Sequence, residues 1–202
     1  MSLFRFDAVF RKGKIKYIAG IDEAGRGPLA GPLTAAAVIL PVEWFLENLA
    51  ESKRLSARRR EKYFSFIIRE ALSYAVVSVC PRTIDRLNIF RATYMAMKRA
   101  VHCLSIVPDM LLIDGPHRLD IPLRQASVVH GDRQSAAIAS ASILAKVHRD
   151  RLMMKLDKKY PQYGFARHKG YPTKDHLKNL RLYGPSPVHR KSFSPVKNWK
   201  TL

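Results

Sequence analysis

The segment KYIAGIDEAGRGPLAGPLTAAAVIL, residues 16–40, decides the fold. Residues 16–21 are mostly apolar and strand-like and end at Asp22, and residues 33–40 form a second apolar segment of strand length. The stretch between them is a Gly- and Pro-rich loop with no room for a crossover helix. Because parallel neighbours need such a crossover, we expect these two strands to pair antiparallel.

The remaining pattern adds three strands and several helices. Strand character returns at residues 73–80, where Pro81 should stop it, and again at residues 110–113 and 125–129. Helical spacing is present at residues 56–72, 88–104, 135–160 and 174–182. This order predicts an α/β fold, in which residues 1–160 form a mixed five-stranded sheet flanked by helices and residues 161–202 form a basic C-terminal helical extension packed on it.

The chain is strongly basic. Its 202 residues include 36 Lys and Arg against 16 Asp and Glu, a formal charge of +20. Such a surplus attracts a polyanion, and nucleic acid is the leading candidate. An anionic membrane surface is the competitor, but it would favour one basic amphipathic helix, whereas here the charge is spread along the chain.

Several other classes of protein are disfavoured. The longest apolar runs are well short of the ~18 to 20 residues that span a bilayer. The N-terminal residues carry no continuous apolar signal segment, so we expect a cytoplasmic protein with no membrane contact. Cys80 and Cys103 lack the spacing of zinc or redox sites and are expected to be reduced, buried thiols.

Acidic residues follow three of the expected strands. Asp22, Asp114 and Asp132 each come after an apolar segment, and Glu23 adjoins Asp22. Side chains at neighbouring strand ends can converge in a crevice, and oxygen-only ligands select Mg²⁺ or Mn²⁺. Taken singly, an Asp after a strand is most often a turn or cap residue. Glu23 can join Asp22 only if the backbone turns there, because adjacent strand residues point to opposite faces.

The glycines after the first strand allow two interpretations. Residues 25–30 satisfy the G-x-G-x-x-[GA] dinucleotide pattern, but Pro28 and Pro32 interrupt the helix that this motif requires. Two closely set glycines also permit backbone N–H groups to approach a phosphate or sugar, with Arg26 adding charge. The histidines at 168 and 176 show no ligand-like partners in the sequence.

The order of motifs resembles that of the ribonuclease HII family, the type 2 ribonucleases H. The matching segments are GIDEAGRGPLAGP at 20–32, ESKRLS at 51–56, LNIFRATYMAM at 87–97, LLIDG at 111–115, GD at 131–132, IASASILAKVHRD at 138–150, YGFARHKGYPTKDH at 163–176 and GPSPVHRKSF at 184–193.

The resemblance implies a ribonuclease H-like fold and an endoribonuclease. It would hydrolyse the RNA strand of RNA–DNA hybrids and incise on the 5′ side of single ribonucleotides in duplex DNA, leaving 5′-phosphate and 3′-hydroxyl ends. The resemblance also implies that two Mg²⁺ or Mn²⁺ ions take part in this hydrolysis. The family's catalytic and metal-binding acids fall on Asp22, Glu23, Asp114 and Asp132. Its substrate contacts fall on Gly25, Arg26, Gly27, Lys53, Lys169 and Tyr171.

The sequence departs from the family pattern at two positions, and one alternative function is kept. Glu51 stands where the family usually has Asp, and Arg133 places a cation next to Asp132. The rival is a non-catalytic RNA- or ribosome-binding basic protein, which accounts for the charge but not for three acids at strand ends. We expect a monomer, and the sequence leaves open whether a sliding clamp binds it.

Overall fold

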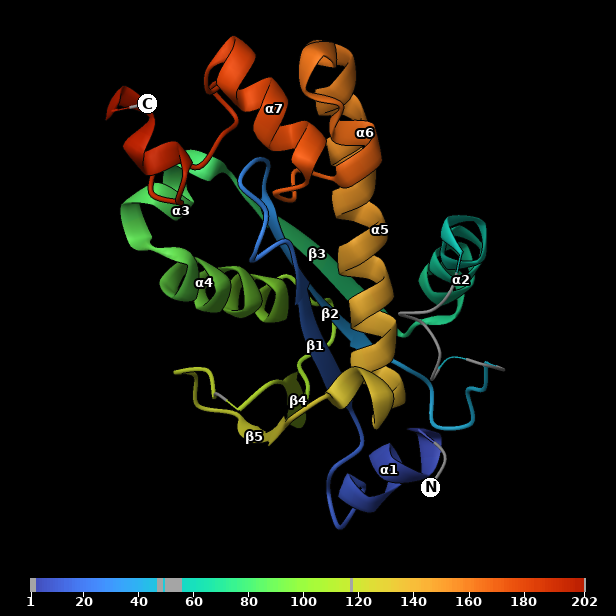
Figure 1. The fold of residues 1–202 in the computed structure, drawn as a ribbon. Coiled ribbons are helices and arrows are strands. Elements are labelled where there is room, and N and C mark those ends of the chain that lie inside the picture. The colour runs from blue at the N-terminus through green and yellow to red at the C-terminus, as the bar shows by residue number, and fades with distance from the viewer. Residues whose placement is uncertain (1–2, 47–48, 50–55, 117, 202) are drawn as a thin grey trace.

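The computed structural model describes residues 3–46, 49, 56–116 and 118–201, and its centre is one five-stranded sheet (Figure 1). The strands are β1 Ile18–Ala24, β2 Leu33–Ile39, β3 Ser73–Val79, β4 Met110–Asp114 and β5 Arg124–Val128. Their order in the sheet is β3-β2-β1-β4-β5. β1 pairs antiparallel with β2 and parallel with β4, so the predicted mixed sheet with antiparallel early strands is confirmed.

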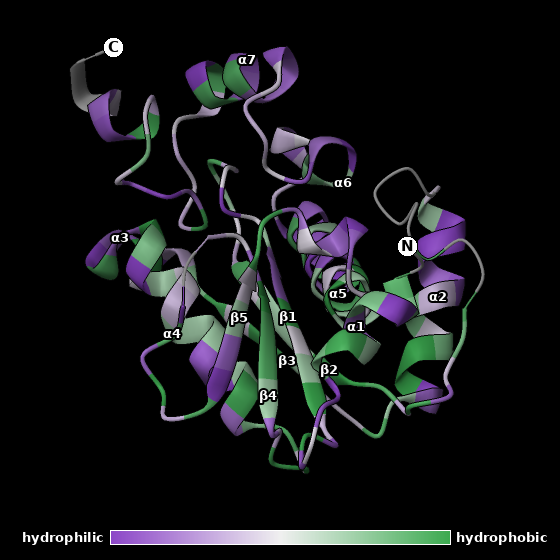
Figure 2. Ribbon diagram, turned by 90° about the horizontal axis from the view of Figure 1, so that it is seen from below, coloured by the Kyte–Doolittle hydropathy of each residue, from purple (hydrophilic) through white to green (hydrophobic). Residues whose placement is uncertain are grey.

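Helices cover both faces of this sheet. They are α1 Leu3–Phe10, α2 Ala57–Glu70, α3 Pro81–Leu87, α4 Ile89–His102, α5 Ala136–Lys159, α6 Phe165–His168 and α7 Lys174–Tyr183, with short 3-10 turns η2 Gly131–Arg133, η3 Pro161–Tyr163 and η4 Val196–Thr201. The end-on view shows α3 and α4 on one side of the strands and α1, α2 and α5 on the other (Figure 2). The fold is therefore a helix–sheet–helix sandwich, in which β1 is the middle strand.

The fully buried strand β2 shows how its sequence serves both layers. Ala36 and Val38 belong to the apolar cluster formed with α2 and α5, whereas Ala35, Ala37 and Ile39 belong to the cluster formed with α4. Alternate strand residues face opposite sides, so a continuous apolar run is what a central strand covered on both faces requires.

Small residues bring α5 unusually close to β1. A Cβ atom added at Gly20 would lie 2.0 Å from the carbonyl carbon of Ala137, so only glycine fits there. The first half of α5 is rich in alanine and almost wholly buried. The close contact directs the next turns of α5 over the end of β1, where the acidic residues lie (Figure 1).

The segment after α5 returns to pack on the second half of α5 and on the loop after β1. Ala30, Met153, Tyr163 and Phe165 form one buried cluster there. The expected helix near residues 174–182 is present as α7, capped by the Thr173 hydroxyl, which accepts from the His176 N–H. The division of the chain at residue 160 stays a prediction.

Some local expectations were wrong. β1 continues through Asp22 to Ala24 rather than ending at residue 21. The strand β3 ends before Pro81, as expected, but Pro81 also occupies the first turn of helix α3, which was not expected, at a position where its missing N–H costs nothing. The thiols of Cys80 and Cys103 are free, as expected, but exposed rather than buried. The N-terminal helix α1 was not predicted either.

Candidate active site

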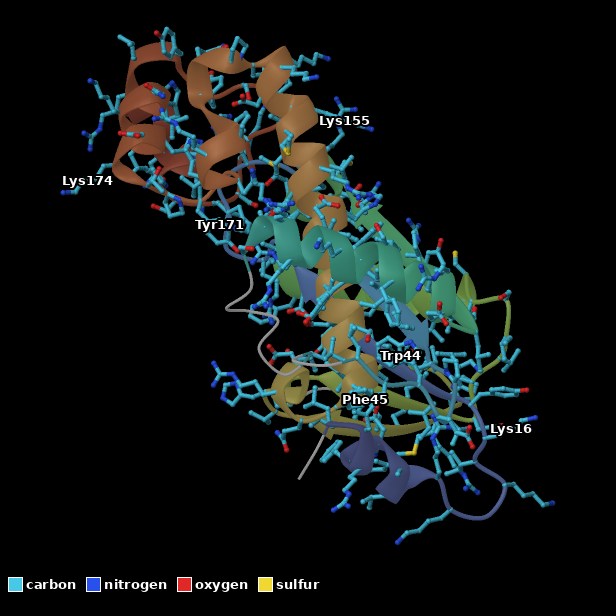
Figure 3. All side chains as sticks on the ribbon, turned by 90° about the vertical axis from the view of Figure 1, so that its right-hand side faces the viewer. Lys16, Trp44, Phe45, Lys155, Tyr171 and Lys174 are labelled. Atoms are coloured by element: carbon cyan, nitrogen blue, oxygen red, sulfur yellow. The ribbon has the colours of Figure 1, made fainter. Side chains whose placement is uncertain are left out.

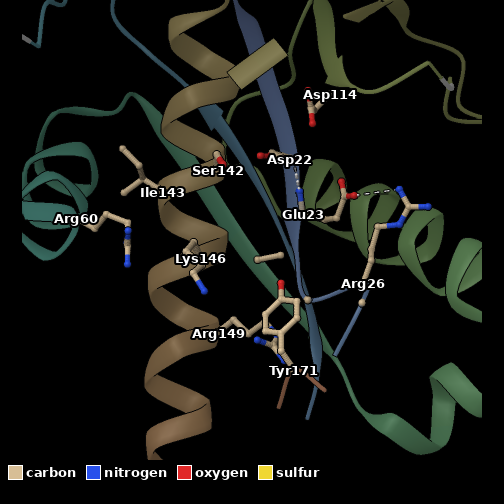
Figure 4. Close-up of a pocket in the computed structure, with 13 residues that line it drawn as sticks. Asp22, Glu23, Arg26, Arg60, Asp114, Ser142, Ile143, Lys146, Arg149 and Tyr171 are labelled. Carbon is tan, nitrogen blue, oxygen red and sulfur yellow. Dashed lines mark hydrogen bonds and ion pairs between the residues drawn. The ribbon is translucent and has the colours of Figure 1, made fainter. Parts of the chain in front are cut away.

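Three carboxylates meet where β1 and β4 end. Ile21 of β1 stands opposite Ile113 of β4, so Asp114 follows in register beside Asp22. Asp22, Glu23 and Asp114 all line one cavity of about 380 Å³ (Figure 4). The convergence predicted from strand ends is therefore present for these three residues.

Asp22 is the most enclosed of the three. It lies on the face of β1 that carries α5, the residue is 4 % exposed, and its Oδ1 accepts a hydrogen bond of 2.7 Å from the N–H of Glu23. Burial raises the pKa of Asp22 well above its usual value, and the charges of Glu23 and Asp114 raise it further. A hydrogen bond with Ser142 of α5 offsets part of this rise.

Glu23 joins the cavity without the predicted turn of the backbone. It lies within β1 and pairs with Ala35 of β2, and the chain turns only at Gly25, where φ is +96°. Because the pairing of β4 with β1 stops at Ile113, the edge of β1 is uncovered beside Glu23. Burial raises the pKa of Glu23; Arg26, whose Nη1 lies 3.3 Å from Oε1, lowers it, and Asp114 raises it.

Asp132 lies behind this group rather than in it. It sits in η2, just after β5, is 1 % exposed, and does not line the cavity. The preceding residue connects it to the site, because the N–H of Gly131 donates to Asp114 Oδ1 at 2.6 Å. Arg133, the unusual cation beside it, is exposed.

The donor chemistry of the site fits a hard divalent cation. Three acidic side chains line one cavity. Burial and mutual repulsion raise the pKa values of Asp22 and Glu23, and a bound cation would stabilise their charged forms. Oxygen ligands of this kind suit Mg²⁺ or Mn²⁺. As placed, however, the described residues contain no group of three His, Cys, Asp or Glu side chains close enough to hold one ion together.

Two buried arginines hold the loop after β1, and sequence reasoning missed both. Arg190 donates to the carbonyl oxygens of Gly25 at 2.6 Å, Arg26 at 2.9 Å and Gly31 at 3.1 Å. Arg149 of α5 donates to the carbonyl oxygen of Pro32 at 2.8 Å. Burial, together with the nearby charge of Arg149, lowers the pKa of Arg190 to about 9. Their partners lie more than a hundred residues away, so no local pattern could reveal these contacts.

The predicted substrate contacts are placed unevenly. The cavity is lined by Gly25, Arg26, Gly27 and Tyr171. Tyr171 is 42 % exposed, and its ring points into the cavity (Figure 4). Lys169 does not line the cavity: its ammonium donates to the Ala166 carbonyl, and its own carbonyl accepts from Arg149 Nη2 at 2.9 Å. The predicted phosphate contact Lys53 lies outside the described residues.

Comparison with known proteins identifies the family. The family model for ribonuclease HII matches residues 19–196. A ribonuclease HII of Coxiella burnetii is 55 % identical over 183 residues, which are 91 % of this chain and 91 % of that protein. The chain belongs to the ribonuclease HII family.

Solved structures agree with this assignment to ribonuclease HII. The ribonuclease H2 of Pyrococcus horikoshii matches with a TM-score of 0.78 at 26 % identity, covering 92 % of this chain and 98 % of that one. A ribonuclease HII from Archaeoglobus fulgidus, solved in complex with PCNA, matches with a TM-score of 0.73 at 27 % identity. The match covers 89 % of this chain and 96 % of that one. The predicted ribonuclease H-like fold is confirmed.

Basic residues surround the acidic cavity of this ribonuclease HII. Arg60 of α2 and Lys146 of α5 line it, and Lys146 Nζ donates to Asp150 Oδ1 at 2.8 Å. The side view places Tyr171 and Lys174 on the same side of the C-terminal helices (Figure 3). In the described part of the chain, no helix is both long and apolar enough to cross a membrane.

Proposed function

We propose that this ribonuclease hydrolyses the RNA strand of RNA–DNA hybrids and incises on the 5′ side of single ribonucleotides within duplex DNA. One observation carries the proposal. The carboxylates of Asp22, Glu23 and Asp114 line the same cavity as the 25–27 loop and Tyr171. Groups suited to activating water at a phosphate and groups suited to reading a ribose therefore face one substrate position.

We assign Asp22, Glu23, Asp114 and Asp132 to the binding of two divalent cations, Mg²⁺ or Mn²⁺. Such ions supply a water that ionises near neutral pH and stabilise the leaving 3′-oxygen. Asp22 and Glu23 bring their oxygens from adjacent positions of one strand, and Asp114 brings its own from the neighbouring strand. Asp132 stands behind Asp114, to which Gly131 connects it.

The loop after β1 is assigned to reading the 2′-hydroxyl. Arg190 donates to the carbonyl oxygens of Gly25 and Arg26, and we assign the backbone N–H groups of residues 25–27 to the sugar. Gly27 has no side chain to keep a ribose away, and the Tyr171 ring lies beside it. Only RNA presents the 2′-hydroxyl, which makes this loop a discriminator between RNA and DNA.

Phosphates of the duplex are assigned to the basic side chains around the cavity. Arg60 and Lys146 line it, and Lys174 projects outward from the C-terminal helices (Figure 3). Lys53 and Lys169 keep the roles of phosphate contacts only as predictions. Monomeric state and cytoplasmic location are likewise expected, and they do not affect the chemistry.

The experiment that tests the proposal uses a DNA duplex carrying one ribonucleotide, incubated with the protein in Mg²⁺, in Mn²⁺ and in EDTA. We expect a single cut 5′ of the ribonucleotide in either metal and none in EDTA. Binding without cleavage in every condition would contradict the proposal and support the rival, a non-catalytic RNA-binding protein.

A further inference from the structure

Three histidines cluster on the side of Tyr171 remote from the acids, and none of them lines the cavity. His168 is at the end of α6, His176 is in α7, and His189 lies in the loop after α7. The rings of His168 and His176 stack with centroids 4.5 Å apart, and those of His176 and His189 lie 5.2 Å apart. No sequence pattern indicated these ring contacts, because the three histidines come from different segments.

The hydrogen bonds of this cluster have only one possible direction. The backbone N–H of Ser186 donates to His189 Nδ1 at 2.9 Å, and a backbone N–H can only donate. The proton of neutral His189 is therefore on Nε2, which lies 3.0 Å from His176 Nε2. His189 donates there and His176 accepts, so the His176 proton is on Nδ1.

This series of hydrogen bonds ends at the backbone of Tyr171. His176 Nδ1–H donates to the Tyr171 carbonyl oxygen at 2.9 Å, and the Thr173 N–H donates to the same oxygen at 2.8 Å. On the other side, the Tyr171 N–H donates to the His168 carbonyl oxygen at 2.9 Å. The backbone of this residue is thus held at both of its polar atoms, while its ring stays exposed to the cavity.

The adjoining residue ties the same segment to the loop that reads the sugar. The Gly170 carbonyl oxygen accepts from the Leu29 N–H at 2.8 Å, and the Gly170 N–H donates to His168 Nδ1 at 3.2 Å. A Cβ at Gly170 would lie 2.4 Å from the Ala30 carbonyl oxygen, so the two segments are in close contact. The backbone next to Tyr171 is therefore fixed relative to this loop by the contacts of Gly170.

A structural metal does not explain the cluster. Both ring nitrogens of His176 are engaged, one with His189 and one with Tyr171. Those of His168 are engaged by the Gly170 N–H and the Tyr163 carbonyl oxygen, the latter at 2.8 Å. Every nitrogen of these two rings is used in orienting the chain.

We infer that His176, held in its Nδ1–H tautomer by His189 and Ser186, is a positioning residue that sets the Tyr171 ring against the substrate. The inference rests on the proposed function, because it assigns Tyr171 to the junction between the ribonucleotide and the next deoxynucleotide. His176 touches no substrate and acts only through the Tyr171 backbone. Its neighbour His189 is fully buried and supports it in the same chain.

The test is a double-mutant cycle in single-turnover incision of a duplex with one ribonucleotide. His176→Phe keeps an aromatic ring of similar size and removes both hydrogen bonds, and we expect it to slow incision by about 10- to 100-fold, the cost of misplacing a reacting group by about an ångström. In the Tyr171→Ala background the same substitution should have almost no further effect. An equal loss in both backgrounds would overturn the inference.

Two further variants separate positioning from folding. His176→Asn can donate from its amide to the Tyr171 carbonyl, and it should restore most of the lost rate; failure to rescue in a protein that melts like the wild type would contradict the role. His102→Phe removes an exposed histidine at the end of α4 and serves as the matched control. It should leave incision unchanged.

Nitrogen-15 NMR of the imidazoles gives a readout that needs no activity. We expect Nδ1–H at His176 and Nε2–H at His189 in the wild-type protein, whether or not it cuts the duplex. The opposite tautomers would refute the inference even if incision is observed. Correct tautomers in a protein that cuts nothing would instead refute the proposed function and leave the hydrogen-bond chain intact.

Discussion

Gly27→Ala should separate reading of the substrate from folding of the loop. A Cβ at Gly27 would meet only Tyr171 Cε1, at 3.7 Å, which is ordinary van der Waals contact, and the backbone there is not in the left-handed region. We therefore expect the free energy of unfolding to change by no more than about 0.5 kcal/mol. The added methyl group nonetheless projects into the cavity where we place the ribose.

The expected cost of Gly27→Ala falls on catalysis. If the methyl keeps the sugar about 1 Å from its position, incision should slow by roughly 100-fold. The assay is single-turnover cleavage of a duplex with one ribonucleotide at saturating enzyme, with thermal melting of the same preparation. Near wild-type incision by a stably folded Gly27→Ala would refute the assignment of this loop to the 2′-hydroxyl.

Gly25→Ala is the matched control, because that glycine has a structural reason to be there. Its φ is +96°, and a Cβ would lie 2.1 Å from Arg149 Nε. Left-handed strain of ~1 to 3 kcal/mol and disturbance of a buried charged hydrogen bond worth ~1.5 to 3 kcal/mol predict a loss of about 3 kcal/mol or more. That loss corresponds to a fall in Tm of roughly 6 to 12 °C. An unchanged Tm would show that Arg149 does not depend on this glycine.

Three further outcomes are expected. Tyr171→Ala should reduce incision strongly and Tyr171→Phe only mildly, because Phe keeps a ring worth ~1 to 3 kcal/mol by stacking; equal rates for Tyr171→Ala and wild type would exclude the junction role. Arg190→Met should leave three loop carbonyls without a donor and lower the free energy of unfolding by at least about 2 kcal/mol, which urea melts can measure; no change would contradict its role as the loop's anchor. Burial and the neighbouring His176 lower the pKa of His189 to about 4. Because the unfolded chain then binds this proton at a higher pH than the folded protein, the free energy of unfolding should fall by up to about 1.4 kcal/mol per pH unit as the pH falls from about 6.5 to 4. His189→Gln should make this dependence less steep in thermal melts across the same range. An unaltered dependence would refute the buried neutral state.

Much of the fold could be predicted from sequence because its signals are local. The apolar run of β2, buried on both faces, and the small residues of α5 are periodic patterns readable within one segment. The same is true of the Ser56 cap of α2, whose hydroxyl accepts from the Arg59 N–H. The helix α3 was missed because Pro81, which ends the preceding strand, also occupies the first turn of a helix.

The candidate site was only partly predictable, for a different reason. Asp22 and Asp114 could be placed together because each follows an apolar strand that is visible in the local sequence, and parallel strands end at the same edge of a sheet. The loop partners of Arg149 and Arg190, and the His176 partner of His189, could not be predicted, since each lies in another segment and depends on the finished packing. The close contact of α5 with the strand at Gly20 is likewise a tertiary property.

The acidic residues give the most direct test of the central claim, that the acids at the ends of β1 and β4 are required for hydrolysis of the RNA strand. The measurement is incision of a duplex with one ribonucleotide by the wild type and by Asp22→Asn in Mg²⁺, with the binding of the same duplex measured in parallel. We predict a single cut 5′ of the ribonucleotide by the wild type, with 3′-hydroxyl and 5′-phosphate ends, and no detectable cut by Asp22→Asn although its duplex binding is largely retained. Near wild-type turnover by Asp22→Asn would contradict the account.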